Sequence, residues 1–198
     1  KDKTKQFIVP LAVGKLLIEW GVDQSIIHEM NWWEEFELNK HLKIAATPAQ
    51  HFSGRGLMDR NETLWVSYSI ISNSHRIYYS GDSGYFSGFK EIGEKYGPFD
   101  MTFLECGAYD KAWHFVHMMP EEVIQAHQEL KGNILHPIHW GTFNLAYHDW
   151  DDPMKRLSIA AKANNIQLAT PITGETTIYN TKIPSNPWWE GTRLAKSD

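Results

Sequence analysis

The segment His136-Pro-Ile-His-Trp-Gly-Thr-Phe143 ends an apolar stretch and places an imidazole beside small residues that suit a tight strand exit. Two earlier segments, Thr47–Arg55 and Ser80–Gly84, have the same layout and contribute His51 and Asp82. A rigid sheet fixes the backbone at strand ends, and the adjoining loops let side chains converge. Two imidazoles and one carboxylate at three strand ends are typical of a zinc-type hydrolytic centre. The sequence therefore predicts that these three side chains meet in the folded chain.

The composition is that of a globular protein, because 42% of the 198 residues are hydrophobic and 22% are charged. This length suits one domain, which we place at residues 1–198, with an irregular tail from about residue 184. The net charge of −5, without a basic run among the aromatic residues, disfavours nucleic acid as a partner. The single cysteine, Cys106, excludes an intrachain disulfide and a CxxC zinc knuckle. We expect Cys106 to be a small buried hydrophobe.

The sequence carries no targeting signal that would decide its location. No stretch approaches the roughly 18 apolar residues that a membrane span needs, and no signal peptide is recognisable. The opening Lys1–Lys5 does not resemble a natural start, so we expect the natural N-terminus to lie upstream. The compartment therefore stays open between the cytoplasm and a membrane-associated location.

Strands and helices alternate along the chain, which predicts an α/β fold with a mixed sheet. Runs of β-branched and aromatic residues between short polar turns indicate strands, whereas longer segments ended by proline indicate helices. The predicted strands are 6–10, 31–38, 41–48, 63–71, 75–80, 99–105 and 133–138, with a closing pair within 166–179. The predicted helices are 11–20, 86–96, 120–130 and 153–164.

Six segments, taken in order, resemble the hydrolases of the metallo-β-lactamase fold. They are Pro48–Ser53, Gly81–Tyr85, Gly97–Asp100, Gly107–Tyr109, His117–Glu122 and Ile138–Phe143. The branch that looks most similar is the N-acyl-phosphatidylethanolamine-hydrolysing phospholipase D with its bacterial RomA-like relatives. The openings Phe7–Leu11 and Asn31–Glu34 also resemble that branch, so the resemblance runs from about residue 6 to residue 180. It implies an αββα sandwich.

The resemblance also implies roles for individual residues. His51 matches an imidazole on a first metal ion, His139 matches the imidazole on a second, and Asp82 matches the carboxylate that bridges the two. His117 matches a position near the substrate phosphate. The implied chemistry is attack of a metal-bridging hydroxide on a phosphodiester, with zinc as the metal and a phospholipid or a small molecule as the substrate. Asp82 and His117 are thus the expected catalytic residues.

The chain departs from the family in one respect, because the family's His-x-His-x-Asp-His segment, which supplies four ligands, is absent from it. We therefore expect a C-terminal portion of the sandwich, with the N-terminal half supplied in the same or a separate chain. Three ligands are too few for two zinc ions, since stable sites usually have three or four each. The sequence predicts weak or partial zinc binding by this chain alone and little hydrolysis.

Plainer interpretations stand beside these. Asp82 between two glycines suits a simple turn or a helix cap, and His51 or His117 could be structural. His136 is expected to be structural, because it faces away from His139 on a strand. The tryptophans suit either core packing or an apolar rim, and Trp188 and Trp189 could meet the missing half, a lipid or a partner. The alternatives in function are a lactonase or other small-molecule hydrolase, and an inert, metal-poor fragment or binding module. Contact with a membrane surface is compatible with the phospholipase D resemblance.

Overall fold

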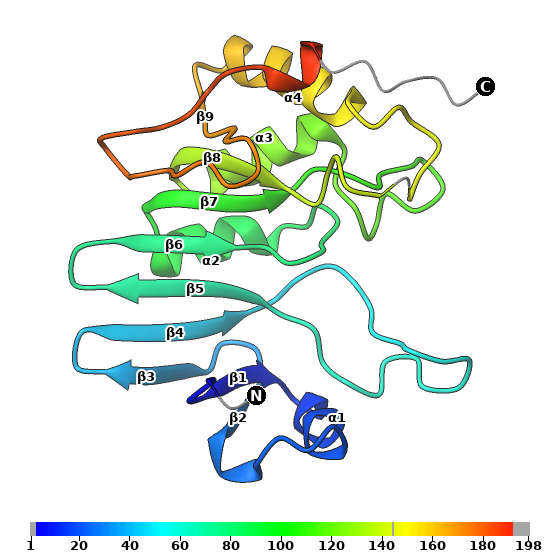
Figure 1. Cartoon of the computed structure of the whole chain (residues 1–198), viewed down its shortest axis with the longest axis vertical. Helices are drawn as coiled ribbons and strands as arrows, with labels where there is room; N and C mark the ends of the chain where they lie inside the picture. Colours follow the sequence, from blue (N-terminus) through cyan, green and yellow to red (C-terminus); the bar gives the residue numbers. More distant parts are fainter. Residues whose placement is uncertain (1–2, 144, 192–198) are drawn as a thin grey trace.

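Seven strands form the main sheet of the computed structural model, which describes residues 3–143 and 145–191 (Figure 1). In sheet order they are β3 (Glu35–Asn39), β4 (Leu42–Thr47), β5 (Ser67–Ser72), β6 (Arg76–Tyr79), β7 (Phe99–Glu105), β8 (Gly132–Ile138) and β9 (Gln167–Leu168). Neighbours from β3 to β6 pair antiparallel, and those from β6 to β9 pair parallel. The predicted mixed α/β fold is confirmed.

Three helices pack against this sheet: α2 (Gly88–Tyr96), α3 (Pro120–Glu129) and α4 (Asp152–Ala163). In Figure 1, α2 and α3 lie behind the sheet and α4 lies at the top, next to α3 and β9. The main core is built between them and the sheet, where Tyr78, Leu104 and Leu135 are fully buried. The start of α3 is fixed by its sequence. Pro120 occupies the first turn, and the carboxylate of Glu122 accepts a hydrogen bond from the N–H of Met119 at 2.8 Å.

Residues 7–30 form a separate small sheet, with its connecting helices, beside the main one. Strand β1 (Phe7–Pro10) pairs parallel with β2 (Ile27–Met30), and α1 (Val13–Glu19) and a short 3₁₀ helix, η1 (Gln24–Ile26), connect the two strands. The sequence did not predict β2. The Tyr68 hydroxyl of β5 donates a hydrogen bond to the carbonyl of Ile8 at 3.1 Å, which ties this small sheet to the main one.

One prediction about the end of the chain is wrong. The closing strand pair within 166–179 reduces to β9 and an isolated bridge between Ile178 and Lys182, because Pro171 and Gly174 interrupt the pairing. Trp188 and Trp189 lie in a 3₁₀ helix, η2 (Trp188–Gly191), and pack on their own domain. Trp189 is only 2% exposed and Trp188 stacks on Trp140 at 5.1 Å between ring centroids, so of the interpretations open for these two residues the structure supports core packing. The rest of the tail, residues 192–198, lies outside the described residues.

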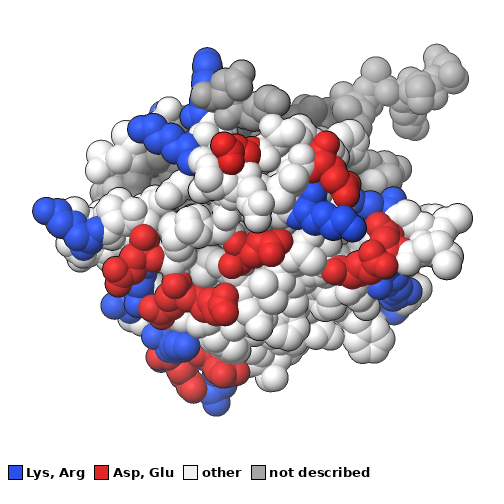
Figure 2. All heavy atoms as spheres, turned by 90° about the horizontal axis from the view of Figure 1, so that it is seen from below, with Lys and Arg blue, Asp and Glu red and all other residues white. Residues whose placement is uncertain are grey.

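Surface charge is mixed on the face drawn in Figure 2, where acidic and basic side chains alternate without a continuous basic band. This face offers no electrostatic track for a phosphate backbone. Within residues 3–143 and 145–191, no helix has the length and apolar character required to cross a bilayer. Cys106 is fully buried, as the sequence predicts.

Four strands run in the same direction, and this decides where the candidate site lies. β4 and β6 are each antiparallel to β5, so they are parallel to one another, and β7 and β8 continue in that direction. Their carboxyl ends therefore share one edge of the sheet, on the right in Figure 1. The loops after these four strands, which begin near residues 48, 80, 106 and 139, gather along that edge.

The buried His127 of α3 predicts a specific pH dependence of stability. Its Nδ1 lies 2.7 Å from the hydroxyl of Thr102, its side chain is 2% exposed, and burial lowers the pKa of His127 from 6.5 to about 4. Between pH 6.5 and about pH 4, the unfolded chain binds a proton at His127 that the folded chain does not. The stabilisation is therefore complete above pH 6.5 and is lost as the pH falls towards 4.

We expect His127 to account for a fall of about 3 kcal/mol in unfolding free energy across that window. Urea unfolding at a series of pH values, compared between the wild type and His127→Gln, measures this contribution. The variant keeps a hydrogen-bonding group for Thr102 but does not titrate, so its stability should depend less steeply on pH. Parallel pH profiles for the two proteins would contradict the prediction.

Candidate functional site

His139 leaves β8 in a tightly constrained backbone position. Its φ of +63° lies in the left-handed region, which residues other than glycine rarely adopt. The loop after β7 passes directly beneath it at Gly107, where an added Cβ would lie 1.9 Å from the carbonyl oxygen of His139. Only glycine permits this approach of two backbones. The contact fixes where the imidazole of His139 enters the loop cluster.

Asp82 faces His139 from the end of β6. Its Oδ1 lies 3.5 Å from the Nε2 of His139, and the preceding Gly81 turns the chain with a φ of +60°. A separation of 3.5 Å is too long for a good hydrogen bond. It is close to the distance of about 3.4 Å between two ligands on one tetrahedral zinc ion with bonds of about 2.0–2.1 Å.

Glu105, at the end of β7, is the buried carboxylate of the site. It is fully buried, its Oε1 accepts a hydrogen bond from the N–H of Met118, and its Oε2 lies 2.9 Å from the Nδ1 of His117. The Nδ1 of His139 lies 4.0 Å from the same Oε2. Glu105, His117 and His139 could hold a metal ion, since one ligand atom from each lies within 4.8 Å of the others.

Burial disfavours the charged forms of Glu105 and His117 as long as both side chains face only protein. Burial raises the pKa of Glu105 well above its usual value, and burial lowers the pKa of His117. Both shifts favour the uncharged forms, because the low-dielectric surroundings penalise a charge. A nearby cation has the opposite effect on a carboxylate. The pair is therefore suited to a site that receives positive charge.

His51 completes the group from the end of β4. Its ring meets the ring of His117 edge to face at 5.4 Å between centroids and stacks on Phe52 at 4.7 Å. Its Nδ1 donates to the carbonyl oxygen of Phe52 at 2.8 Å, which leaves Nε2 as the nitrogen open to a ligand. The rings of His117 and His139 are 5.2 Å apart. The folded chain thus gathers all four residues singled out from the sequence.

Glu105 was not singled out from the sequence, although a signal was present. A glutamate that closes a seven-residue buried strand is costly unless it is paired, so its position after Phe99–Leu104 pointed to a partner. His136, in contrast, lies on β8 with its ring 4.7 Å from Phe103 and takes no part in the group. His114 is exposed in the loop before α3 and also stays outside it.

The donor set fits a metal ion. The Nδ1 of His139 is buried and has no hydrogen-bond partner among the residues that the structure describes. This nitrogen lies 4.0 Å from the Glu105 carboxylate, the kind of group that commonly supports a metal-binding histidine through its second ring nitrogen. Imidazole and carboxylate are donors that zinc accepts, and His139 Nε2 with Asp82 Oδ1 has the matching separation. Glu105 suits a supporting role better, because both of its oxygens already have protein partners.

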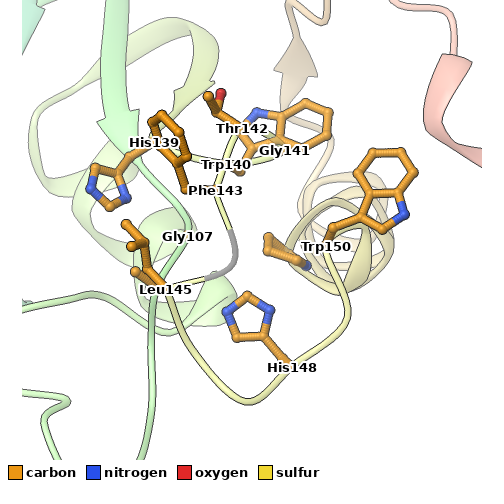
Figure 3. A pocket seen from close by; sticks show the side chains of 11 residues that line it. Gly107, His139, Trp140, Gly141, Thr142, Phe143, Leu145, His148 and Trp150 are labelled. Atoms are coloured by element: carbon orange, nitrogen blue, oxygen red, sulfur yellow. The ribbon is translucent and has the colours of Figure 1, made fainter. Parts of the chain in front are cut away.

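Two hollows flank the group. The first, of about 330 Å³, lies beyond His139 and is lined mainly by apolar groups, as Figure 3 shows. Its lining includes Trp140, Phe143, Leu145, His148 and Trp150. The second, of about 500 Å³, lies beyond His51 and Asp82 and is more polar, with Ser53, Arg55, Asp59 and Glu62 in its lining. A substrate at the donor group would therefore meet unlike surroundings on its two sides.

A mixed sheet with imidazoles and carboxylates gathered at its strand ends is the arrangement of metallo-β-lactamase-fold proteins. Residues 1–140 match the family described as Beta-lactamase superfamily domain, and the chain belongs to this family. The chain is 42% identical over 186 residues to the uncharacterized protein Rv0906 of Mycobacterium tuberculosis, which covers 92% of this chain and 50% of that protein. It is 34% identical over 165 residues to N-acyl-phosphatidylethanolamine-hydrolyzing phospholipase D 1 of Caenorhabditis elegans, covering 77% and 46%.

A further relative is the outer membrane protein RomA of Klebsiella pneumoniae, 48% identical over 100 residues, which are 50% of this chain and 75% of that protein. The chain spans about half the length of the first two relatives. Among solved structures, the metallo hydrolase Igni18 from Ignicoccus hospitalis aligns with a TM-score of 0.70 at 23% identity, covering 89% of this chain and 70% of that one. This likeness supports the fold.

Proposed function

We propose that this chain carries part of the centre of a zinc-dependent hydrolase that cleaves phosphodiesters in the manner of a phospholipase D. The convergence of His51, Asp82, His117 and His139 from separate strand ends and loops carries this proposal. Relatives named phospholipase D and metal-dependent hydrolase support it.

Asp82 and His139 are the residues that we propose as metal ligands in this chain, with His51 as a third donor. A bound zinc ion would supply Lewis acidity and lower the pKa of a bound water. The Asp82 side chain is 46% exposed, so an ion can reach these donors from solvent. Three donors remain few for two ions, as the sequence predicts.

We propose that His117 contacts the substrate. Its Nδ1 faces the Glu105 carboxylate at 2.9 Å, which fixes the ring and leaves Nε2 for the open side. An imidazole backed by a buried carboxylate is suited to hold or transfer a proton at a substrate oxygen. Arg55 lines the polar hollow together with His51 and Asp82, and its positive charge suits a phosphate.

The first test is zinc binding by the chain itself. We expect isothermal titration to show a dissociation constant of about micromolar or weaker, because the donors are few. Binding should be lost in Asp82→Asn and retained in His114→Asn, which alters an exposed imidazole outside the group. Two sites of nanomolar affinity would contradict the expected ligand deficit, and zinc binding unchanged by Asp82→Asn would contradict the proposed centre.

The second test is hydrolysis, measured with the chain joined to a His-x-His-x-Asp-His half from the same family. We expect turnover of bis(4-nitrophenyl) phosphate and little turnover of γ-butyrolactone. His117→Ala should lower turnover roughly 100-fold or more while zinc content stays the same, as general acid–base groups contribute about 10²–10⁴-fold. Preferential hydrolysis of the lactone would overturn the phosphodiesterase assignment and favour the small-molecule hydrolase. A parallel loss of zinc would make His117 a ligand or its support.

A further inference from the structure

The loop between β4 and β5 carries two adjacent apolar side chains that residues 3–143 and 145–191 leave exposed. Leu57 is 100% exposed and Met58 is 92% exposed. This loop extends beyond the edge of the sheet at which the candidate site lies, on the right in Figure 1. Apolar residues scattered singly over a surface are common, whereas two neighbours that project almost fully into water are costly unless another surface covers them. We call Leu57 and Met58 the tip of the loop.

Hydrogen bonds close the loop at its base. The N–H of Asn61 donates to the carbonyl oxygen of Ser53 at 2.8 Å, and the Ser53 hydroxyl donates to the carbonyl oxygen of Thr63 at 2.6 Å. These bonds hold the two limbs of the loop together. The tip is therefore presented away from the sheet, which agrees with the exposure of Leu57 and Met58.

Two arginines lie behind the tip. Arg55 precedes Leu57 by two residues, and Arg60 follows Met58 by two. The guanidinium of Arg55 lies 5.2 Å from the centre of the Trp20 ring, and that of Arg60 lies 5.3 Å from the centre of the Phe52 ring. Such contacts between a cation and an aromatic face hold both positive charges close to the apolar tip.

The acidic residue between these arginines is directed inward. The carboxylate of Asp59 accepts hydrogen bonds from the N–H groups of Arg55 at 2.9 Å and Gly56 at 2.7 Å. Its charge is therefore engaged by the backbone of the loop itself. Glu62, the next acidic residue, lines the polar hollow together with Asp59. The outward side of the loop thus combines apolar side chains with positive charge.

A lipid bilayer suits this arrangement better than a protein surface does. A bilayer accepts projecting apolar side chains without a matching pocket, and its phosphate groups lie just outside the hydrocarbon, where the arginines behind the tip can reach them. Trp20, whose side chain is 61% exposed beside Arg55, is a residue type enriched at this boundary.

We propose that Leu57 and Met58 insert into the surface of a phospholipid bilayer while Arg55 and Arg60 bind its phosphate groups. The inference is independent of the proposed hydrolase activity. Because Arg55 also lines the polar hollow next to His51, this contact would turn that hollow towards the lipid headgroups. Binding should be reversible and stronger with anionic lipid, since two apolar side chains and two cations form a modest anchor.

Sedimentation with sucrose-loaded vesicles tests the proposal on the chain as it is. We expect binding to an equal mixture of phosphatidylcholine and phosphatidylglycerol, and weaker binding to phosphatidylcholine alone. Combining Leu57→Ser with Met58→Ser should weaken binding to the mixture about 100-fold, roughly tenfold for each apolar side chain. Combining Arg55→Gln with Arg60→Gln should weaken it about tenfold and reduce the preference for anionic lipid.

The matched control removes two exposed apolar side chains elsewhere. Ile159, on α4, is 71% exposed, and Ile172, after β9, is 51% exposed. Combining Ile159→Ser with Ile172→Ser should leave vesicle binding unchanged. Far-ultraviolet circular dichroism checks that each variant keeps the fold.

A fluorescent label locates the contact. Cys106 is the only cysteine of the chain and is fully buried, so Met58→Cys offers a single accessible thiol for the fluorophore NBD. We expect the NBD emission to shift to shorter wavelength when the mixed vesicles are added. The same label on Ile159→Cys should not respond. Vesicle binding without a response at position 58 would overturn the tip as the contact.

Other occupants of the surface give different results. A shift of the NBD emission that develops without vesicles as the protein concentration rises would assign the tip to a second copy of the chain. Vesicle binding that is lost when the chain is joined to the His-x-His-x-Asp-His half would assign it to that half. Either result would overturn the proposal, and so would absent vesicle binding or binding unchanged by the serine substitutions in the tip. Zinc binding and turnover are not measured, so failure of the proposed function would leave these results unaffected.

Discussion

Replacing His139 by asparagine is expected to weaken zinc binding by the chain at least about 100-fold. Loss of an outer-shell partner of a metal ligand already costs about 10–100-fold in affinity, and His139 offers a ligand atom itself. Its Nε2 lies 3.5 Å from Asp82 Oδ1, the separation expected when both bind one ion. Asparagine is chosen because it tolerates the φ of +63° at this position better than alanine does.

Zinc titration of His139→Asn and His114→Asn measures this effect. Both variants remove one imidazole, but only His139 belongs to the convergent group. Far-ultraviolet circular dichroism checks that the variants keep the fold. Equal zinc affinity in the wild type and His139→Asn would show that the ion binds elsewhere. The group of Glu105, His117 and His139 could not explain such binding, because it also requires His139.

Replacing Gly107 by alanine is expected to destabilise the fold by about 3 kcal/mol, the upper part of the usual range for forced overpacking. The new Cβ would lie 1.9 Å from the carbonyl oxygen of His139 and 3.2 Å from the Cα of Trp140. Both neighbours are backbone atoms, which cannot rotate away, so the loop after β8 must move. The displacement should also weaken zinc binding, since it shifts His139.

Urea unfolding of Gly107→Ala and Gly54→Ala tests this. At Gly54, in another loop at the same sheet edge, an added Cβ would meet its nearest atom at an ordinary 3.7 Å. We expect Gly54→Ala to change the unfolding free energy by no more than about 0.5 kcal/mol. If the two variants unfold at the same urea concentration, the close approach of the two backbones at Gly107 is not a constraint on the native fold.

The sequence predicted strands best where one physical signal dominates. Strand β7 was expected at 99–105 and is observed at Phe99–Glu105, because a short segment rich in apolar residues between a proline and a glycine is typical of a buried strand. The closing pair within 166–179 failed because proline and glycine in that segment outweigh its β-branched residues. Strand β2 was missed because four residues with no clear alternation depend on pairing with β1.

The same division holds at the candidate site. The sequence showed four candidate residues near the ends of predicted strands: His51, Asp82, His117 and His139. They could be recognised because potential metal ligands beside small residues at strand ends form a local pattern. Family resemblance supplied their expected roles. Glu105 carried a weaker signal, a glutamate at the end of a buried strand, and its role depends on burial beside His117 and Met118, which are 12 and 13 residues away along the chain.

By itself, the sequence determined the alternation of strands and helices, the family and the residues that offer metal ligands. These properties depend on residue types and short spacings, which are written in the chain directly. Only the tertiary structure decided which imidazoles face each other and that Glu105 backs His117. Those relations arise from the shared direction of β4, β6, β7 and β8 and from the close approach at Gly107. They join residues 12 or more positions apart in the chain, which no local pattern specifies.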